Sequence, residues 1–223
     1  MAQVLAVRRA LHVDDVELAA RVLADLLHAG VRPVVVDTEP DIVLDEAIRD
    51  AADEVVLVVV GHSPDDDLCW QIATALDTAI LVVPDAPGWQ RRFVSRALVP
   101  LDGTIESAAA VEHVVTLLAA AGIDTLVLHV FSDATVPAMW DHPEHAEAVW
   151  RDEFAARSGA SHWGPVRWRS GDAAESVVDV AADEGTDLIV LAWARNLGEG
   201  RSETVRHTVE HARVPVLLLP VSS

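Results

Sequence analysis

The sequence predicts an α/β protein built from two tandem units, each an open sheet of parallel strands flanked by helices. Its apolar runs are strand-length and alternate with longer helical patterns, which is typical of parallel strands covered on both faces. The order of segments also repeats. Apolar runs at residues 55–61 and 79–84 enclose a helical stretch, and the runs at 188–192 and 216–220 do the same.

The first unit is predicted to span residues 1–86. It opens with a strand at 4–7 and an amphipathic helix at 14–28, with Asp14 or Asp15 as the N-cap and Gly30 as the stop. A segment at 87–94 that begins with a Pro-Gly pair and has little periodicity is predicted to be a linker. The same alternation of patterns places the remaining elements of this unit: strands at 32–37, 55–60 and 80–83, and helices at 42–52 and near 67–76.

The second unit, residues 95–223, contains the same elements and an additional excursion. The first strand and the long buried strand begin 51 residues apart in the first unit, at 4 and 55, but 91 apart in the second, at 97 and 188. The extra residues, about 132–171, carry a predicted helix at 143–158 and a strand at 166–170. The remaining predicted elements are strands at 97–101, 125–131, 188–192 and 216–221, and helices at 106–121, 173–184 and 203–212.

Composition excludes several classes of function. The formal net charge is -20 and all sixteen basic residues are Arg, so no lysine-dependent phosphate site or Schiff base can form. The acidity argues against nucleic-acid binding, and the apolar runs are too short to cross a membrane. The start of the chain lacks a signal-peptide pattern, and a single cysteine, Cys69, fits a reducing compartment. We expect a cytoplasmic protein.

Three segments of the second unit resemble universal stress protein domains. Residues 96–104 (Arg-Ala-Leu-Val-Pro-Leu-Asp-Gly-Thr) are similar to that family's opening strand, 171–191 to its later helix and strand, and 211–220 to its last helix and strand. In the first unit the resemblance rests on residues 55–84. The resemblance to this family implies an adenine nucleotide alpha hydrolase-like, Rossmann-like fold for each unit. It also implies that the units pair through their last strands as an internal pseudo-dimer, and it leaves a homodimer of the chain open.

The resemblance implies a nucleotide site in the second unit only. Many family members bind ATP through an Asp on the first strand and a Gly-x-x-Gly-nine residues-Gly-Ser/Thr motif. Ala192 and Arg195 replace the first two glycines, the loop is shorter, and Trp193 crowds it. We therefore expect a degenerate site for ATP or another adenine nucleotide. The implied binding residues are Asp102, Gly103, Thr104, Arg195, Gly198, Gly200, Arg201 and Ser202.

Three interpretations of function stay open. The favoured one is a non-catalytic stress-response or regulatory protein whose second unit binds a small ligand and whose first unit is mainly structural. In the first unit, Arg8 or Arg9 replaces Asp102, and carboxylates at 65–67 would repel phosphate. The alternatives are an ATP-binding switch that uses Asp102 and the loop at 198–202, and a ligandless scaffold that binds partner proteins. Weak nucleotide hydrolysis is the most enzymatic activity that we expect.

Other residue clusters have structural interpretations. The histidines at 207–211 fit a solvated helix face, and the polar cluster at 141–145 fits a helix start. Cys69 has no evident base nearby and is predicted to be inert core. The excursion is rich in aromatic residues, which either line a small-molecule pocket or pack its helix onto the domain: Trp140, Trp150, Trp163, Trp168 and Phe154.

Overall fold

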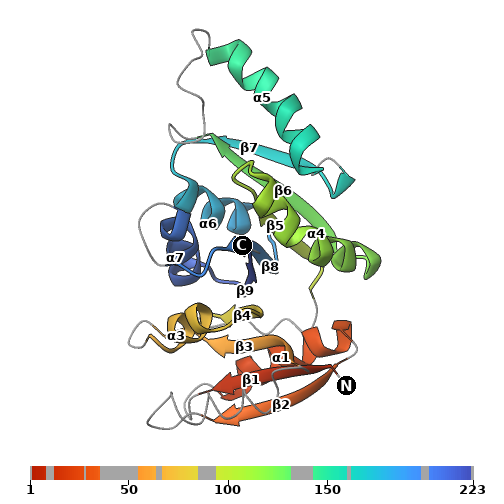
Figure 1. Ribbon diagram of the computed structural model, residues 1–223, viewed down its shortest axis with the longest axis vertical. Helices are drawn as coiled ribbons and strands as arrows, with labels where there is room; N and C mark the ends of the chain where they lie inside the picture. The colour runs from red at the N-terminus through yellow and green to blue at the C-terminus, as the bar shows by residue number, and fades with distance from the viewer. Residues whose placement is uncertain are drawn as a thin grey trace.

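A single sheet runs through the whole molecule (Figure 1). The computed structural model describes residues 2–8, 13–27, 29–35, 55–63, 67–84, 94–131, 143–159, 162–196 and 201–221. Their nine strands are ordered β2-β1-β3-β4-β9-β8-β5-β6-β7. Neighbouring strands are parallel except β4 and β9, which are antiparallel. The predicted α/β class is confirmed, and the two expected sheets are continuous with one another.

The first half of the sheet contains the shorter set of elements. Helix α1 begins at Val13, so Asp14 and Asp15 lie in its first turn and neither is the N-cap; acidic residues are stabilising at both positions, and the pattern does not separate them. Gly30 begins strand β2. The predicted helix at 42–52 and most of the linker lie outside the described residues. The elements are β1 (Gln3–Arg8), α1 (Val13–Leu27), β2 (Gly30–Val35), β3 (Val55–Gly61), α3 (Leu68–Ala75) and β4 (Ala79–Val83).

The second half contains the predicted excursion as an added helix and edge strand. Its helix and strand have the bounds that the sequence predicts, and β7 extends the sheet by pairing with β6. The elements are β5 (Arg96–Pro100), α4 (Ile105–Ala120), β6 (Asp124–Phe131), α5 (Pro143–Ser158), β7 (Val166–Ser170), α6 (Ala173–Asp183), β8 (Leu188–Trp193), α7 (Arg201–His211) and β9 (Val216–Pro220).

The core lies on both faces of the sheet. In β8, Ile189 and Leu191 belong to one hydrophobic cluster, while Leu188 and Val190 belong to the other. Helices α1 and α4 cover one face, and α3, α6 and α7 cover the opposite face. Because side chains of successive strand residues point to opposite faces, two covered faces require a nearly continuous apolar run.

The two halves meet where β4 pairs with β9. Ile80 lies opposite Leu218 and Val82 opposite Val216, and all four side chains are buried. The pairing of these two strands, expected from the resemblance, is observed. It covers two apolar strand edges that would otherwise be open to other chains.

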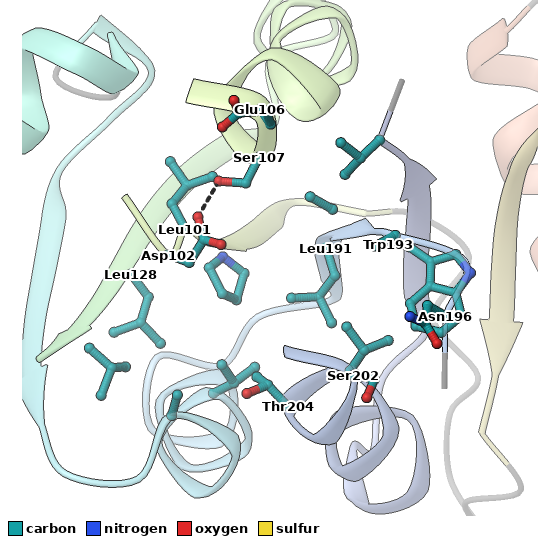
Figure 2. Close-up of a pocket in the computed structure, with 18 residues that line it drawn as sticks. Leu101, Asp102, Glu106, Ser107, Leu128, Leu191, Trp193, Asn196, Ser202 and Thr204 are labelled. Atoms are coloured by element: carbon teal, nitrogen blue, oxygen red, sulfur yellow. Dashed lines mark hydrogen bonds between the residues drawn. The ribbon is translucent and has the colours of Figure 1, made fainter. Parts of the chain in front are cut away.

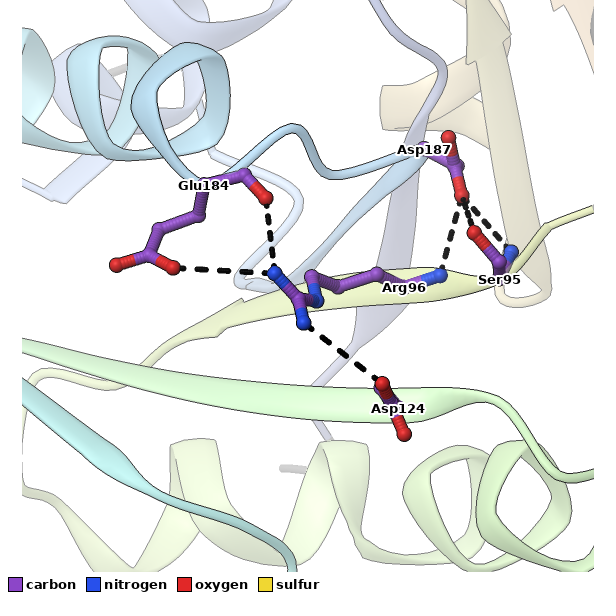
Figure 3. Close-up of polar contacts among 5 residues, drawn as sticks. All are labelled: Ser95, Arg96, Asp124, Glu184 and Asp187. Carbon is purple, nitrogen blue, oxygen red and sulfur yellow. Dashed lines mark hydrogen bonds and ion pairs between the residues drawn. The ribbon is translucent and has the colours of Figure 1, made fainter.

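A polar cluster fixes the entry of the chain into the second half (Figure 3). Asp187, directly before β8, is 1% exposed and accepts hydrogen bonds from Ser95 N at 2.8 Å, Ser95 Oγ at 2.5 Å and Arg96 N at 3.1 Å. The Arg96 guanidinium donates to the Glu184 carbonyl at 3.0 Å and lies 3.8 Å from a carboxylate oxygen of Asp124. These contacts tie the starts of β5, β6 and β8 together.

Candidate ligand-binding site

A pocket of about 180 Å³ opens at the carboxyl ends of β5 and β8 (Figure 2). From β5 the chain proceeds outward to β6 and β7, and it then returns to β8 on the other side of β5. This reversal of strand order is where open α/β sheets bind ligands, because the two connections leave a crevice between them.

The wall of the pocket is mainly apolar, with polar groups from the segments that follow β5 and β8. Its aliphatic residues come from the strands and from α6 and α7: Leu128, Val130, Val177, Leu191, Val205 and Val221. Its polar residues are Asp102, Glu106, Ser107, Asn196, Ser202 and Thr204. An apolar wall with a few convergent polar groups is the usual composition of a small-molecule site.

Asp102 is held in place by the start of α4. Its Oδ1 accepts hydrogen bonds from Thr104 N at 2.9 Å, Thr104 Oγ1 at 2.6 Å and Ser107 Oγ at 2.6 Å. Thr104 is the N-cap of α4, and its Oγ1 accepts from Ser107 N at 3.3 Å. The carboxylate therefore has a fixed orientation at the positive end of a helix.

Gly103 supports this turn and packs against aromatic rings. Its φ is +86°, a backbone conformation that residues with a side chain adopt with strain. A Cβ at this position would lie 3.0 Å from Cζ2 of Trp150 and 3.5 Å from Cε1 of His129. The turn after Asp102 thus requires glycine for two reasons, neither of which involves a ligand.

Five rings pack together beneath the turn and form what we call the aromatic cluster: His129, Phe131, Trp150, Phe154 and Trp168. None of them lines the pocket. Of the two interpretations of the excursion, packing of its helix therefore describes Trp150, Phe154 and Trp168. Trp163 instead lines a depression at the opposite ends of the strands. Trp140 lies outside the described residues.

His129 connects the aromatic cluster to the loop that carries Asp102. It is fully buried, its Nδ1 lies 2.8 Å from the Leu101 carbonyl, and its Nε2 accepts a hydrogen bond from Trp150 Nε1 at 2.9 Å. These partners require a neutral ring with the proton on Nδ1. Burial lowers the pKa of His129, while the Leu101 carbonyl and the charge of Asp102 partly oppose that shift.

The lowered pKa of His129 predicts a loss of stability in mild acid. Below the ordinary value of 6.5, the unfolded chain binds a proton that the folded chain excludes. Stability is therefore full above pH 6.5 and falls, by up to about 1.4 kcal/mol per pH unit, until the folded pKa is reached. Urea unfolding between neutral pH and mild acid measures this slope. The stability of His129→Gln, which keeps a donor and an acceptor, should fall less steeply with decreasing pH than that of the wild type. Equal slopes for the two proteins would contradict the prediction.

The end of β8 turns toward the first half of the chain. Trp193 is 2% exposed, its Nε1 donates to the Ala73 carbonyl in α3 at 3.1 Å, and its ring centroid lies 6.0 Å from that of Trp70. Arg195 has a φ of 55°, and its Nη1 lies 3.5 Å from Oδ1 of Asp77. Trp193 and Arg195, which lie beside and in the expected phosphate loop, thus both contact the first half of the molecule.

The other residues that the resemblance implies for nucleotide binding differ in their positions. Asp102 and Ser202 line the pocket, whereas Thr104 contacts Asp102 through a hydrogen bond. Gly198, Gly200 and the Arg201 side chain lie outside what the structure describes. Four polar residues were missed: Glu106, Ser107, Asn196 and Thr204. Their position in the segments after β5 and β8 was the signal that could have identified them.

Cys69 has a neighbour that the sequence does not reveal. Its Sγ lies 3.4 Å from Nδ1 of His62, and both side chains are buried. The expectation of no nearby base is therefore wrong, because His62, the residue directly after β3, meets Cys69 in the first turn of α3. Within the described ranges, no group of three or more His, Cys, Asp or Glu side chains could share a metal ion. His207 and His211 stack on α7 with centroids 4.1 Å apart.

The fold and the site define a class: a doubly wound α/β protein with a pocket where its strand order reverses. The chain belongs to the universal stress protein family, whose family model matches residues 93–220, more than half of the sequence. A comparison with curated proteins finds no match. Along the described segments, no helix combines the length and the apolar character needed to span a membrane.

Solved structures with a similar fold extend over nearly the whole chain. A universal stress protein from Pseudomonas aeruginosa has a TM-score of 0.66 at 14% identity, covering 99% of this chain and 93% of its own. One from Archaeoglobus fulgidus has a TM-score of 0.62 at 12% identity, covering 99% and 97%. A universal stress protein in complex with cAMP covers 58% of this chain and 98% of its own, with 19% identity and a TM-score of 0.41.

Proposed function

We propose that this chain is a non-catalytic stress-response or regulatory protein that binds a small ligand in the pocket and has a degenerate phosphate site. Membership of the universal stress protein family supports a role in stress response. The observation that carries this proposal is that the side chains of Trp193 and Arg195 point toward the first half of the chain. Both occupy the segment that would approach phosphates in ATP-binding relatives, and both contact the first half of the chain. We further propose a cytoplasmic location.

The charge of the pocket supports the loss of phosphate binding. Asp102 and Glu106 both line it, and none of its described lining residues is an Arg. Phosphate sites ordinarily combine backbone N–H groups with Arg or Lys side chains. Among the described lining residues a triphosphate would meet two carboxylates and no cationic side chain, and like charges at short distance oppose its binding.

The hydrogen bonds of the pocket residues support the proposal that the protein is not an enzyme. Ser107 Oγ donates to Asp102 Oδ1, but that oxygen also accepts from Thr104 N and Thr104 Oγ1, and these hydrogen bonds stabilise the charged carboxylate and weaken it as a base for Ser107. His129, the nearest buried imidazole, does not line the pocket and has a partner at each nitrogen. A nucleophile needs a base that is able to take its proton; the Asp102 oxygen is shared by three donors and both nitrogens of His129 have other partners.

Titration calorimetry of the nucleotide-stripped protein with ATP and magnesium tests this function. We expect the wild type to show no saturation below millimolar ATP. The double variant Ala192→Gly/Arg195→Gly should bind ATP about tenfold more tightly than the wild type, because glycines permit close approach to phosphate and release the contact with Asp77. Micromolar ATP binding by the wild type that Asp102→Ala abolishes would instead establish an ATP-binding switch.

A further inference from the structure

We infer that the pocket selects a compact one- or two-ring compound that carries an ammonium or hydroxyl donor and no anionic group. This inference rests on the proposed function and names the class of ligand that the same site would take. It follows from the size of the pocket, the residues of its wall and the sign of its charge.

The size of the pocket limits the ligand to a small ring system. Its volume is about 180 Å³. An apolar cavity of roughly 150 Å³ in another protein binds benzene, so a space slightly larger accommodates one ring or two fused rings. Leu128, Val130, Leu191 and Val177 supply aliphatic surface around this space. A flat apolar ring would remove that surface from water.

The charge of the pocket favours a cationic or neutral donor over an anion. Asp102 Oδ1 is fixed by three hydrogen bonds, so the carboxylate cannot turn away from a ligand without breaking them. Glu106, in the first turn of α4, adds a second carboxylate. The Arg195 guanidinium lies 3.5 Å from Asp77 and is not among the lining residues. A ligand ammonium would therefore be attracted to this wall, and a ligand carboxylate or phosphate would be repelled.

The polar groups also define how such a ligand would lie. Figure 2 shows Asp102 and Ser107 on one side of the pocket and Ser202 and Thr204 on the other, with Leu191 between them. A ring placed over Leu191 can direct its donor arm toward Asp102. Because Asp102 Oδ1 already accepts three hydrogen bonds, the preference for such an arm comes from the negative charge of the carboxylate.

A matched pair of probes tests the sign of the charge on the full-length protein. Tryptamine and indole-3-acetate share the indole ring and carry opposite charges. By titration calorimetry we expect tryptamine to bind at least about tenfold more tightly than indole-3-acetate. Asp102→Asn keeps an acceptor for Thr104 and Ser107 but removes the charge. It should reduce the ratio of the affinity for tryptamine to the affinity for indole-3-acetate. Asp124→Asn makes the same change of charge outside the pocket and should leave the preference unaltered.

A second pair of variants tests the location. Ala173 lines the pocket from the first residue of α6, so Ala173→Phe should fill the space and abolish tryptamine binding. Ala109→Phe, at an exposed position of α4, should not. Equal or tighter binding of indole-3-acetate, no saturation by tryptamine at millimolar concentration, or binding that survives Ala173→Phe would each overturn the inference. The proposed function fails on a different result, namely micromolar binding of ATP by the wild type.

Discussion

Trp193→Ala is expected to lower the free energy of unfolding by about 3–5 kcal/mol, the usual range for removing a buried tryptophan. The ring is 2% exposed and packs against Trp70, so the substitution leaves a cavity between the two halves of the molecule. It also removes the donor to the Ala73 carbonyl, and a buried acceptor without a partner adds to the loss. Urea unfolding at neutral pH, followed by circular dichroism, measures the change.

Trp193→Phe is a milder change at the same position. It keeps an aromatic ring against Trp70 but removes the N–H group and part of the indole, so we expect a smaller loss than for alanine, of about 2 kcal/mol. It also retains enough packing to be measurable if the alanine variant does not fold. A Trp193→Ala variant as stable as the wild type would show that the contact with α3 does not hold the halves together.

Asp187→Ala is expected to destabilise the protein by about 3 kcal/mol, since it removes a buried carboxylate together with the three charge-assisted hydrogen bonds that it accepts. The substitution would leave Ser95 N and Arg96 N without their acceptor at the start of β5. Thermal and urea unfolding should both report the loss.

Two asparagine variants provide the controls for Asp187. Asp187→Asn keeps one acceptor oxygen and nearly the same shape, so it should lose less stability than the alanine variant. Asp124→Asn removes a carboxylate that is 77% exposed, and its effect should stay within about 0.5 kcal/mol. If Asp187→Ala and Asp124→Asn lowered stability by similar amounts, the cluster at the start of β5 would contribute no more stability than an exposed ion pair.

Much of the fold was predictable because its elements obey local periodicities. The bounds of α5 and β7 follow from their sequence patterns, and the carboxyl edge of the sheet could be located from strands alone. The start of α1 could not be fixed, because Asp14 and Asp15 are equally favourable at the cap and in the first turn. Strand bounds elsewhere differ by one or two residues, which is the uncertainty of helix and strand ends themselves.

The candidate site was predictable only in part. Asp102 follows an apolar strand with a recognisable turn, so its position on the sheet edge could be inferred from the sequence. The contacts of Trp193 could not, because Ala73 is 120 residues away along the chain and nothing in either segment specifies the other. The same holds for Trp150, which bonds to His129 from a helix in the excursion. Local patterns determine which side chains are buried, and tertiary packing determines which of them meet.

The antiparallel pairing of β4 with β9 has a consequence for the site at the end of β8. Both strands belong to one polypeptide, so their association is intramolecular and depends on an effective concentration that dilution does not change. Two separate chains with the same interface would dissociate below their dissociation constant. Because Trp193 reaches across from the pocket wall to α3, covalent tethering keeps that wall assembled at any protein concentration.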